Sequence, residues 1–197
     1  MKELNLGFLA SHSGSNMQAI IDNVKAGKLY ANLCAMISNN KSSFALERAS
    51  KECIPHFVVN ETTHPNNTNE EITKIFKAHN VDTIILAGYM KIISKYLIDS
   101  FNGRILNIHP ALLPKFGGKG MYGSNVHEAV IKSGEVISGA TIHLVNSEYD
   151  KGTILQQMEV PVLSDDTPET LAKRVLEAEH ILYSDTLIKI ADGRIKL

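Results

Sequence analysis

The sequence predicts an α/β protein with a doubly wound, mostly parallel sheet, to which antiparallel strands are added in the C-terminal half. In the first hundred residues, short apolar runs alternate with segments whose apolar residues recur at helical spacing. After residue 135, two runs instead alternate apolar and polar residues, which is typical of antiparallel strands. The 197 residues, 44% of them apolar, are enough for one well-buried domain.

The first 109 residues contain five predicted strands, at 4–10, 33–38, 56–59, 82–88 and 104–109. The strand at 82–88 is apolar throughout, as expected for a strand covered on both faces. Between these strands we predict helices at 15–27, 43–53, 69–80 and 94–101. In the second helix we expect Phe44, Ala45 and Ala49 to face inward.

The second half begins with a glycine-rich loop at 116–125, which leads into a helix at 125–134. Two strands follow, at 138–145 and 153–162. The longest helix spans 167–193, with Thr167 as its N-cap, Pro168 in the first helical position and Gly193 at its end. No linker interrupts the chain, so we predict one domain over 1–197, with two halves at 1–100 and 101–197.

Composition narrows the possible partners. The net charge is -1, which gives no electrostatic basis for nucleic acid or a membrane surface as the main partner. No apolar run is long enough to span a bilayer. Cys34 and Cys53 lack metal-site spacing, and we expect both to be free, buried thiols. These features favour a cytoplasmic protein without a metal.

A turn containing Gly14, Ser15 and Asn16 joins the first strand to the first helix. In a doubly wound sheet this turn lies at the carboxyl end of the strand, where ligands bind. Free N–H groups at the start of a helix favour an anion, and glycine lets the anion approach the backbone. The alternative is that Ser15 or Asn16 only caps the helix.

Asn107 and His109 are two residues apart on the fifth strand and therefore point to the same face. An amide donor beside an imidazole, followed at once by Pro110, favours a catalytic site over a structural histidine. Other candidates have simple structural explanations. Asp150 suits a turn, Glu179 suits a solvated helix face, and the apolar loop after Gly88 suits either core packing or the wall of a flat-ligand site.

Five motifs then occur in a fixed order: "GSN" at 14–16, "LAGYMKIIS" at 86–94, "LNIHPALLPKF" at 106–116, "YDKGTILQQ" at 149–157 and "RVLEAEHILY" at 174–183. With these motifs the sequence closely resembles the phosphoribosylglycinamide formyltransferases, from Leu6 to about Lys196. The Asn-x-His-Pro segment is shared by the wider folate-dependent formyltransferases, which have a Rossmann-like fold.

The resemblance implies that the amine of N1-(5-phospho-D-ribosyl)glycinamide attacks the formyl carbon of 10-formyltetrahydrofolate, in de novo purine biosynthesis. A tetrahedral intermediate forms directly, and tetrahydrofolate leaves. The catalytic residues would be Asn107, His109 and Asp150. An amide can stabilise the oxyanion, and an imidazole can carry the proton. We expect Asp150 to raise the pKa of His109 and to keep it protonated longer.

The resemblance also implies the binding residues. The ribonucleotide would contact Gly14, Ser15, Asn16, Leu176, Glu177, Ala178 and Glu179, with the Glu179 carboxylate accepting ribose hydroxyls. The folate would contact Met90, Lys91, Ile92, Ile93, Asn107, Asn146, Ser147, Glu148, Tyr149 and Asp150. The half at 1–100 would bind the nucleotide and its phosphate, and the half at 101–197 would bind folate and catalyse. Small molecules would be the partners of a monomer or homodimer.

Three features differ from some family members. Lys91 stands where many have arginine, the segment 60–69 lacks an arginine, and the glycine-rich loop is longer. The alternatives are methionyl-tRNA formyltransferase, which usually has an added C-terminal domain, and a formyl-folate hydrolase, which usually has an added N-terminal one. We expect neither added domain here. A non-catalytic nucleotide-binding protein would explain the Gly-Ser-Asn turn but not Asn107, His109 and Asp150 together.

Overall fold

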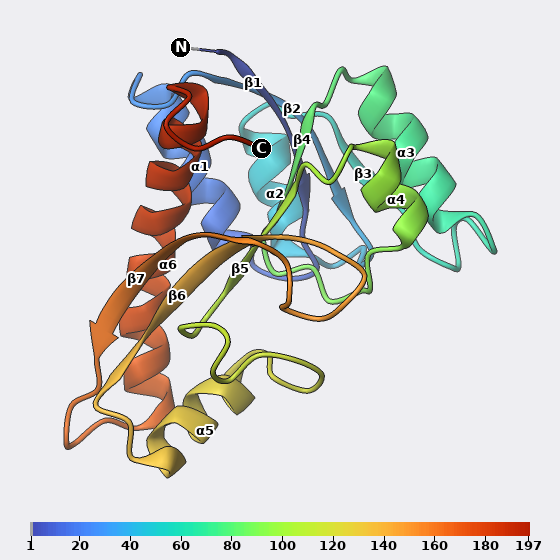
Figure 1. The fold of residues 1–197 in the computed structure, drawn as a ribbon. Helices are drawn as coiled ribbons and strands as arrows, with labels where there is room; N and C mark the ends of the chain where they lie inside the picture. Colours follow the sequence, from blue (N-terminus) through green and yellow to red (C-terminus); the bar gives the residue numbers. More distant parts are fainter. Residues whose placement is uncertain (1) are drawn as a thin grey trace.

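The computed structural model describes residues 2–197 and is built around a seven-stranded sheet (Figure 1). The strands are β1 (Leu4–Leu9), β2 (Ala31–Ser38), β3 (His56–Val58), β4 (Thr83–Leu86), β5 (Ile105–His109), β6 (Ile137–Leu144) and β7 (Ile154–Pro161). The helices are α1 (Ser15–Lys25), α2 (Phe44–Lys51), α3 (Thr68–Ala78), α4 (Lys95–Ser100), α5 (Ser124–Ser133) and α6 (Pro168–Ala191).

The strand order is β3-β2-β1-β4-β5-β6-β7. The first five strands pair in parallel, and β6 and β7 pair antiparallel. The predicted fold class is therefore confirmed. The chain reverses its direction across the sheet between β1 and β4, the kind of switch point at which doubly wound sheets bind ligands.

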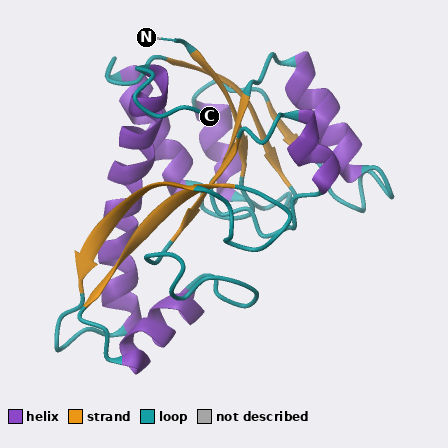
Figure 2. Cartoon of the chain, viewed as in Figure 1, coloured by secondary structure: helices purple, strands orange, loops and turns teal. Residues whose placement is uncertain are grey.

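Helices cover both faces of the sheet (Figure 2). One core contains Phe8, Ile20 and Tyr183 and lies under α1, α2 and α6. The other contains Leu9 and Phe76 and lies under α3 and α4. Because β1 and β4 are buried on both faces, they read as near-continuous apolar runs, which is why the sequence identified them.

The longest helix, α6, begins at a reciprocal cap. The Thr167 hydroxyl accepts from the Thr170 N–H, and the Thr170 hydroxyl accepts from the Thr167 N–H. Pro168 occupies the first helical position, where a missing N–H costs nothing. This start satisfies N–H groups in the first turn of α6, the helix that carries Glu179.

Three expectations need correction. β2 begins at Ala31, two residues before the predicted start at Leu33, because its first residues pair with the beginning of β1. The Phe44 side chain is 44% exposed rather than inward, since its ring lies under the guanidinium of Arg48. Both cysteines are free, but Cys53 is exposed and Cys34 only half-buried, so neither is fully buried.

Candidate active site

The predicted site residues gather near the ends of β1, β4 and β5, and the loops after β5 and β6 lie beside them (Figure 1). Asn107 is paired with Leu86, the last residue of β4, so β5 runs on beyond its neighbour. The part of β5 that projects carries His109, which is only 3% exposed. The site is therefore buried at its base and bounded by loops.

The three predicted catalytic residues lie together. His109 Nδ1 is 3.5 Å from Asp150 Oδ2. Asp150 Oδ1 in turn lies 3.6 Å from His143 Nε2, and that same nitrogen lies 3.1 Å from Asn107 Nδ2. One continuous chain of polar contacts thus joins Asn107 to His109 through His143 and Asp150.

His143 is the functional residue that sequence reasoning missed. It lies on β6 directly opposite Asn107 in the antiparallel register, and its side chain is buried. Its Nδ1 faces the Leu144 carbonyl at 2.9 Å and must therefore donate, which leaves Nε2 to accept from the Asn107 amide. One Asn107 N–H is fixed in this way, and the second is left for a ligand.

The pKa of His109 is lowered from its ordinary value. Burial is the largest cause, while the Asp150 charge and the Phe116 carbonyl act in the opposite direction. Asp150 does raise the pKa of His109, as expected. The expected net increase of this pKa is nevertheless wrong, because the effect of burial outweighs that of Asp150. At pH 7 the neutral imidazole therefore predominates.

Asp150 stays charged because several donors surround it. Burial raises the pKa of its carboxyl, but the neighbouring His143 side chain, the hydrogen bond from the Gly118 N–H and the charge of His109 when it is protonated lower it overall. The Gly118 N–H lies 2.9 Å from Asp150 Oδ2. Asp150 itself has a φ of 54°, so it does occupy a tight turn while facing the histidines.

The base of the glycine-rich loop forms hydrogen bonds with two of the predicted catalytic residues. His109 Nε2 donates to the Phe116 carbonyl at 2.8 Å, and Gly118 donates to Asp150. A Cβ on Gly117 would lie 2.5 Å from Leu113 Cδ2, so a larger residue there would have to displace the end of the Leu113 side chain. The loop therefore orients both residues through its backbone.

At the start of α1, Gly14 is the N-cap residue, with a φ of 65°, and no side chain caps the helix. The alternative, that Ser15 or Asn16 only caps α1, is thus wrong. A Cβ on Gly14 would lie 2.6 Å from Ala45 Cβ, so α2 packs tightly against this turn. The first N–H groups of α1 are left without side-chain acceptors, as an anion site requires.

Asn16 and Glu179 meet although they are far apart in the sequence. Asn16 Nδ2 donates to Glu179 Oε2 at 2.7 Å, and both residues are buried. Asn16 Oδ1 has no hydrogen-bond partner within residues 2–197. Burial raises the pKa of Glu179 to about 7, with the Asn16 amide as a weaker opposing contact. The expectation of a solvated Glu179 is therefore wrong.

The other predicted ribonucleotide contacts on α6 lie either in the core or on the exposed side of the helix. Ala178 is buried in the core under α6. Leu176 and Glu177 are exposed. Glu179 is thus the member of this turn that meets the α1 residues.

The predicted folate residues form a loop after β4 and a second loop after β6. Met90 and Ile92 are 45% and 70% exposed, which removes core packing as their explanation, whereas Ile93 is buried. The Met90 N–H donates to the Ser11 hydroxyl at 2.8 Å, which fixes the first loop against the end of β1.

In the second loop, the Asn146 side chain accepts from the Glu148 N–H, and Tyr149 is half exposed. Both predicted folate loops therefore expose apolar or aromatic side chains.

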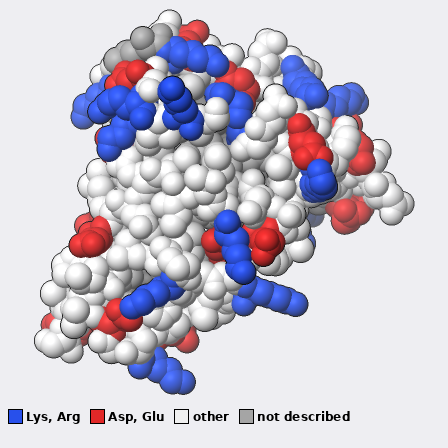
Figure 3. All heavy atoms as spheres, viewed as in Figure 1, with Lys and Arg blue, Asp and Glu red and all other residues white. Residues whose placement is uncertain are grey.

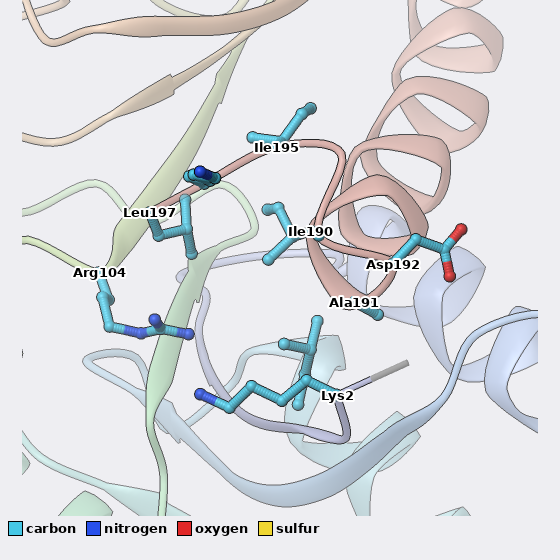
Figure 4. A pocket seen from close by; sticks show the side chains of 10 residues that line it. Lys2, Arg104, Ile190, Ala191, Asp192, Ile195 and Leu197 are labelled. Atoms are coloured by element: carbon cyan, nitrogen blue, oxygen red, sulfur yellow. The ribbon is translucent and has the colours of Figure 1, made fainter.

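Other parts of the surface carry no comparable arrangement. A hollow of about 580 Å³ opens at the opposite, amino end of the strands, lined by Lys2, Arg104 and the end of α6 (Figure 4). It contains none of the predicted site residues. On the face shown in Figure 3, basic and acidic side chains are interspersed. Across residues 2–197, no helix is long and apolar enough to cross a membrane, and no group of three or more His, Cys, Asp or Glu side chains is arranged to hold a metal ion.

The fold and this site define the class of protein. A sequence model of the formyl transferase family matches residues 4–187, so the chain belongs to that family. It is 43% identical over 194 residues to "Phosphoribosylglycinamide formyltransferase, chloroplastic" of Arabidopsis thaliana, covering 97% of this chain and 66% of the relative. The chain thus spans about two thirds of that protein.

Two further comparisons cover more of the relative. The chain is 36% identical over 194 residues to "Phosphoribosylglycinamide formyltransferase" of Haemophilus influenzae, covering 98% of this chain and 89% of the relative. The crystal structure of phosphoribosylglycinamide formyltransferase from Anaplasma phagocytophilum superposes with a TM-score of 0.90 at 38% identity, covering 100% of this chain and 90% of the other.

Proposed function

We propose that the protein transfers the formyl group of 10-formyltetrahydrofolate to the amine of N1-(5-phospho-D-ribosyl)glycinamide. The observation that carries this proposal is the contact chain Asn107–His143–Asp150–His109, which lies at the same edge of the sheet as the Asn16–Glu179 pair. The relatives at 36–43% identity named for this activity support it.

The transfer begins when the amine nitrogen bonds to the formyl carbon. The formyl oxygen then becomes an oxyanion, and the free N–H of Asn107 donates to it. Because His143 holds the other N–H, the amide cannot rotate away. The pre-set donor thus favours the tetrahedral intermediate over the substrate.

The attacking nitrogen must lose a proton, and the leaving nitrogen of the folate must gain one. His109 Nε2 already donates to Phe116, so Nδ1 is the basic atom. A proton on Nδ1 faces the charged Asp150 carboxylate, which stabilises it. The same proton passes to the folate nitrogen as its bond to the formyl carbon breaks, so no other reactant is needed.

The proposed binding residues form two sets, one for each substrate. The ribonucleotide occupies Gly14, Ser15, Asn16 and the α6 turn with Glu179, and the folate lies along Met90–Ile93 and Asn146–Asp150. Both sets draw on residues from 1–100 and from 101–197. We include in the proposal a cytoplasmic location, small-molecule partners, no metal, and a monomer or homodimer.

The test is turnover by the purified chain with both substrates. We expect formylated ribonucleotide and tetrahydrofolate to appear in equal amounts, and His109→Ala to lose about 10²–10⁴ in kcat. Formate release without the ribonucleotide would support the hydrolase instead. Transfer only to methionyl-tRNA would support the other transferase, and binding without turnover would support a nucleotide-binding protein.

A further inference from the structure

The proposed ribonucleotide contacts contain no positive charge. The set Gly14–Asn16 and Leu176–Glu179 has no lysine or arginine, and it includes two acids, Glu177 and Glu179. A phosphate monoester carries about -1.5 to -2 near neutral pH. The N-terminus of a helix supplies only about half a positive charge. A further cation should therefore lie beside this turn.

Arg48 on α2 is in contact with the turn. Its Nε donates to the Ser13 carbonyl at 2.9 Å, one residue before Gly14. Its Nη1 donates to Gln18 Oε1, on α1, at 3.2 Å. These two contacts hold the guanidinium along the first turn of α1, where the helix has no side-chain cap.

The charge of Arg48 is not neutralised by the protein. Within residues 2–197 no carboxylate forms an ion pair with it, and its two hydrogen bonds go to neutral acceptors. Three of its five N–H groups are thus left for another acceptor. The guanidinium lies 4.9 Å from the centre of the Phe44 ring, which holds it in place and explains why Phe44 is exposed.

The charge of Arg48 also affects a residue of α6, next to Glu179. The pKa of His180, which follows Glu179, is lowered first by burial and then by the charge of Arg48. Arg48 therefore acts on the space between α1 and α6, and not only on its own helix.

We propose that Arg48 binds the phosphate of the ribonucleotide and determines the preference for a phosphorylated substrate. This inference rests on the proposed function. A guanidinium suits the role because its planar N–H groups match two phosphate oxygens, whereas the backbone N–H groups of the turn bind the third.

The test compares two acceptors, the ribonucleotide and the same molecule without its phosphate. Arg48→Met keeps a long apolar stem over Phe44 but removes the charge. It should raise KM for the ribonucleotide roughly 10- to 100-fold and leave KM for the dephosphorylated acceptor within about twofold. The KM of Arg48→Lys for the ribonucleotide should lie between those of the wild type and Arg48→Met, because lysine keeps the charge but lacks the planar set of N–H donors.

Lys51 provides the matched control. It lies on the same helix and near the same ring, 5.8 Å from its centre, but no hydrogen bond like that of Arg48 joins its side chain to the turn. Lys51→Met should leave both KM values unchanged. An equal rise in both KM values for Arg48→Met would mean that Arg48 only holds the Ser13 carbonyl, and no rise in either would mean that it is unimportant; both results overturn the proposal.

A second measurement separates this inference from the proposed function. Inorganic phosphate is titrated into the wild type and Arg48→Met while the backbone N–H signals of Ser15 and Asn16 are followed by NMR. Weaker phosphate binding by the variant, by about tenfold or more, supports Arg48 even if the protein fails to transfer formyl groups. Equal binding by both proteins overturns the inference whatever the activity.

Discussion

Two carboxylates lie in the site, and their surroundings give them opposite properties. Asp150 is surrounded by donors and histidines, and its pKa is lowered despite burial. Glu179 is buried with one neutral donor, and its pKa is raised to about 7. The difference shows that donors, rather than burial alone, decide the charge of a carboxylate. The proposed catalytic region holds a fixed negative charge on Asp150, and the proposed nucleotide region holds a carboxyl group, that of Glu179, whose charge depends on pH.

The catalytic side of this comparison depends on the Asp150 charge, so Asp150→Asn should have the largest effect. Asn tolerates the left-handed turn at this position, so the backbone should persist. We expect kcat to fall about 10²–10⁴-fold. The pKa of His109 should drop further, which moves the acidic limb of the pH–rate profile to lower pH, because the basic form then persists to lower pH.

Measurement of kcat/KM against pH for the wild type and the variant decides the matter. An unchanged rate and profile would leave Asp150 as a turn residue only, and the contrast with Glu179 would then have no catalytic meaning.

Glu179→Gln should have the next largest effect, on stability. A carboxyl whose folded pKa lies above its unfolded one contributes stability that is complete below the ordinary value of 4.5. That stability is lost as pH rises through about 7. Gln does not titrate, so its free energy of unfolding should not show this loss. Relative to the wild type, the free energy of unfolding of the variant should therefore rise by up to about 3 kcal/mol between pH 4 and pH 8.5.

Urea unfolding at both pH values measures this gain. Glu177→Gln, at an exposed position on the same helix, should show no such gain. If the two variants behaved alike, the nucleotide region would hold a permanently charged carboxylate, as the catalytic region does.

Gly14→Val tests whether the nucleotide region can be damaged alone. The new side chain would meet Ala45 and would have to adopt a positive φ, so we expect KM for the ribonucleotide to rise by about tenfold or more while KM for folate is retained. Gly27→Val is the control, since Gly27 has nearly the same φ, 67°, but open space around it. A change in KM for folate alone would mean that the two substrates are assigned to the wrong pockets, with folate bound at the Gly14 turn.

Ser11→Ala should have the smallest effect, and on folate. Loss of the hydroxyl that accepts from the Met90 N–H should raise KM for folate roughly fivefold, the scale of about 1 kcal/mol for one hydrogen bond. Ser43 is also buried and donates to the His12 carbonyl, but it does not touch the folate loop. If Ser43→Ala raised the folate KM equally, the cause would be a general disturbance of the turn between β1 and α1, and not the loss of the hydrogen bond between Ser11 and Met90.

The sequence predicted what depends on local periodicity. The period of two along β5 brought Asn107 and His109 together, and the apolar runs identified the parallel strands. The pairing of Asp150 with His109 came only from the family resemblance, because its turn motif has a simple local explanation. The period of α2 gave the burial of Ala45 and Ala49, but it could not show that Phe44 would lie at the boundary under Arg48.

Contacts between distant segments could not be predicted from one sequence. His143 faces Asn107 because of the antiparallel register between β5 and β6, which no local pattern specifies. A histidine in an alternating strand was the available signal, but many such residues are structural. The raised pKa of Glu179 likewise follows from helix packing that only the folded chain reveals.

The central claim is that the two carboxyl groups ionise over different pH ranges, and titration of their ¹³C signals by NMR tests it most directly. The Glu179 signal should move with a midpoint near pH 7, and the Asp150 signal should move with a midpoint below the ordinary value of an aspartate. Asp150→Asn and Glu179→Gln assign the two signals by their disappearance. Two midpoints that both lie near the ordinary values, or a Glu179 midpoint below that of Asp150, would contradict the account.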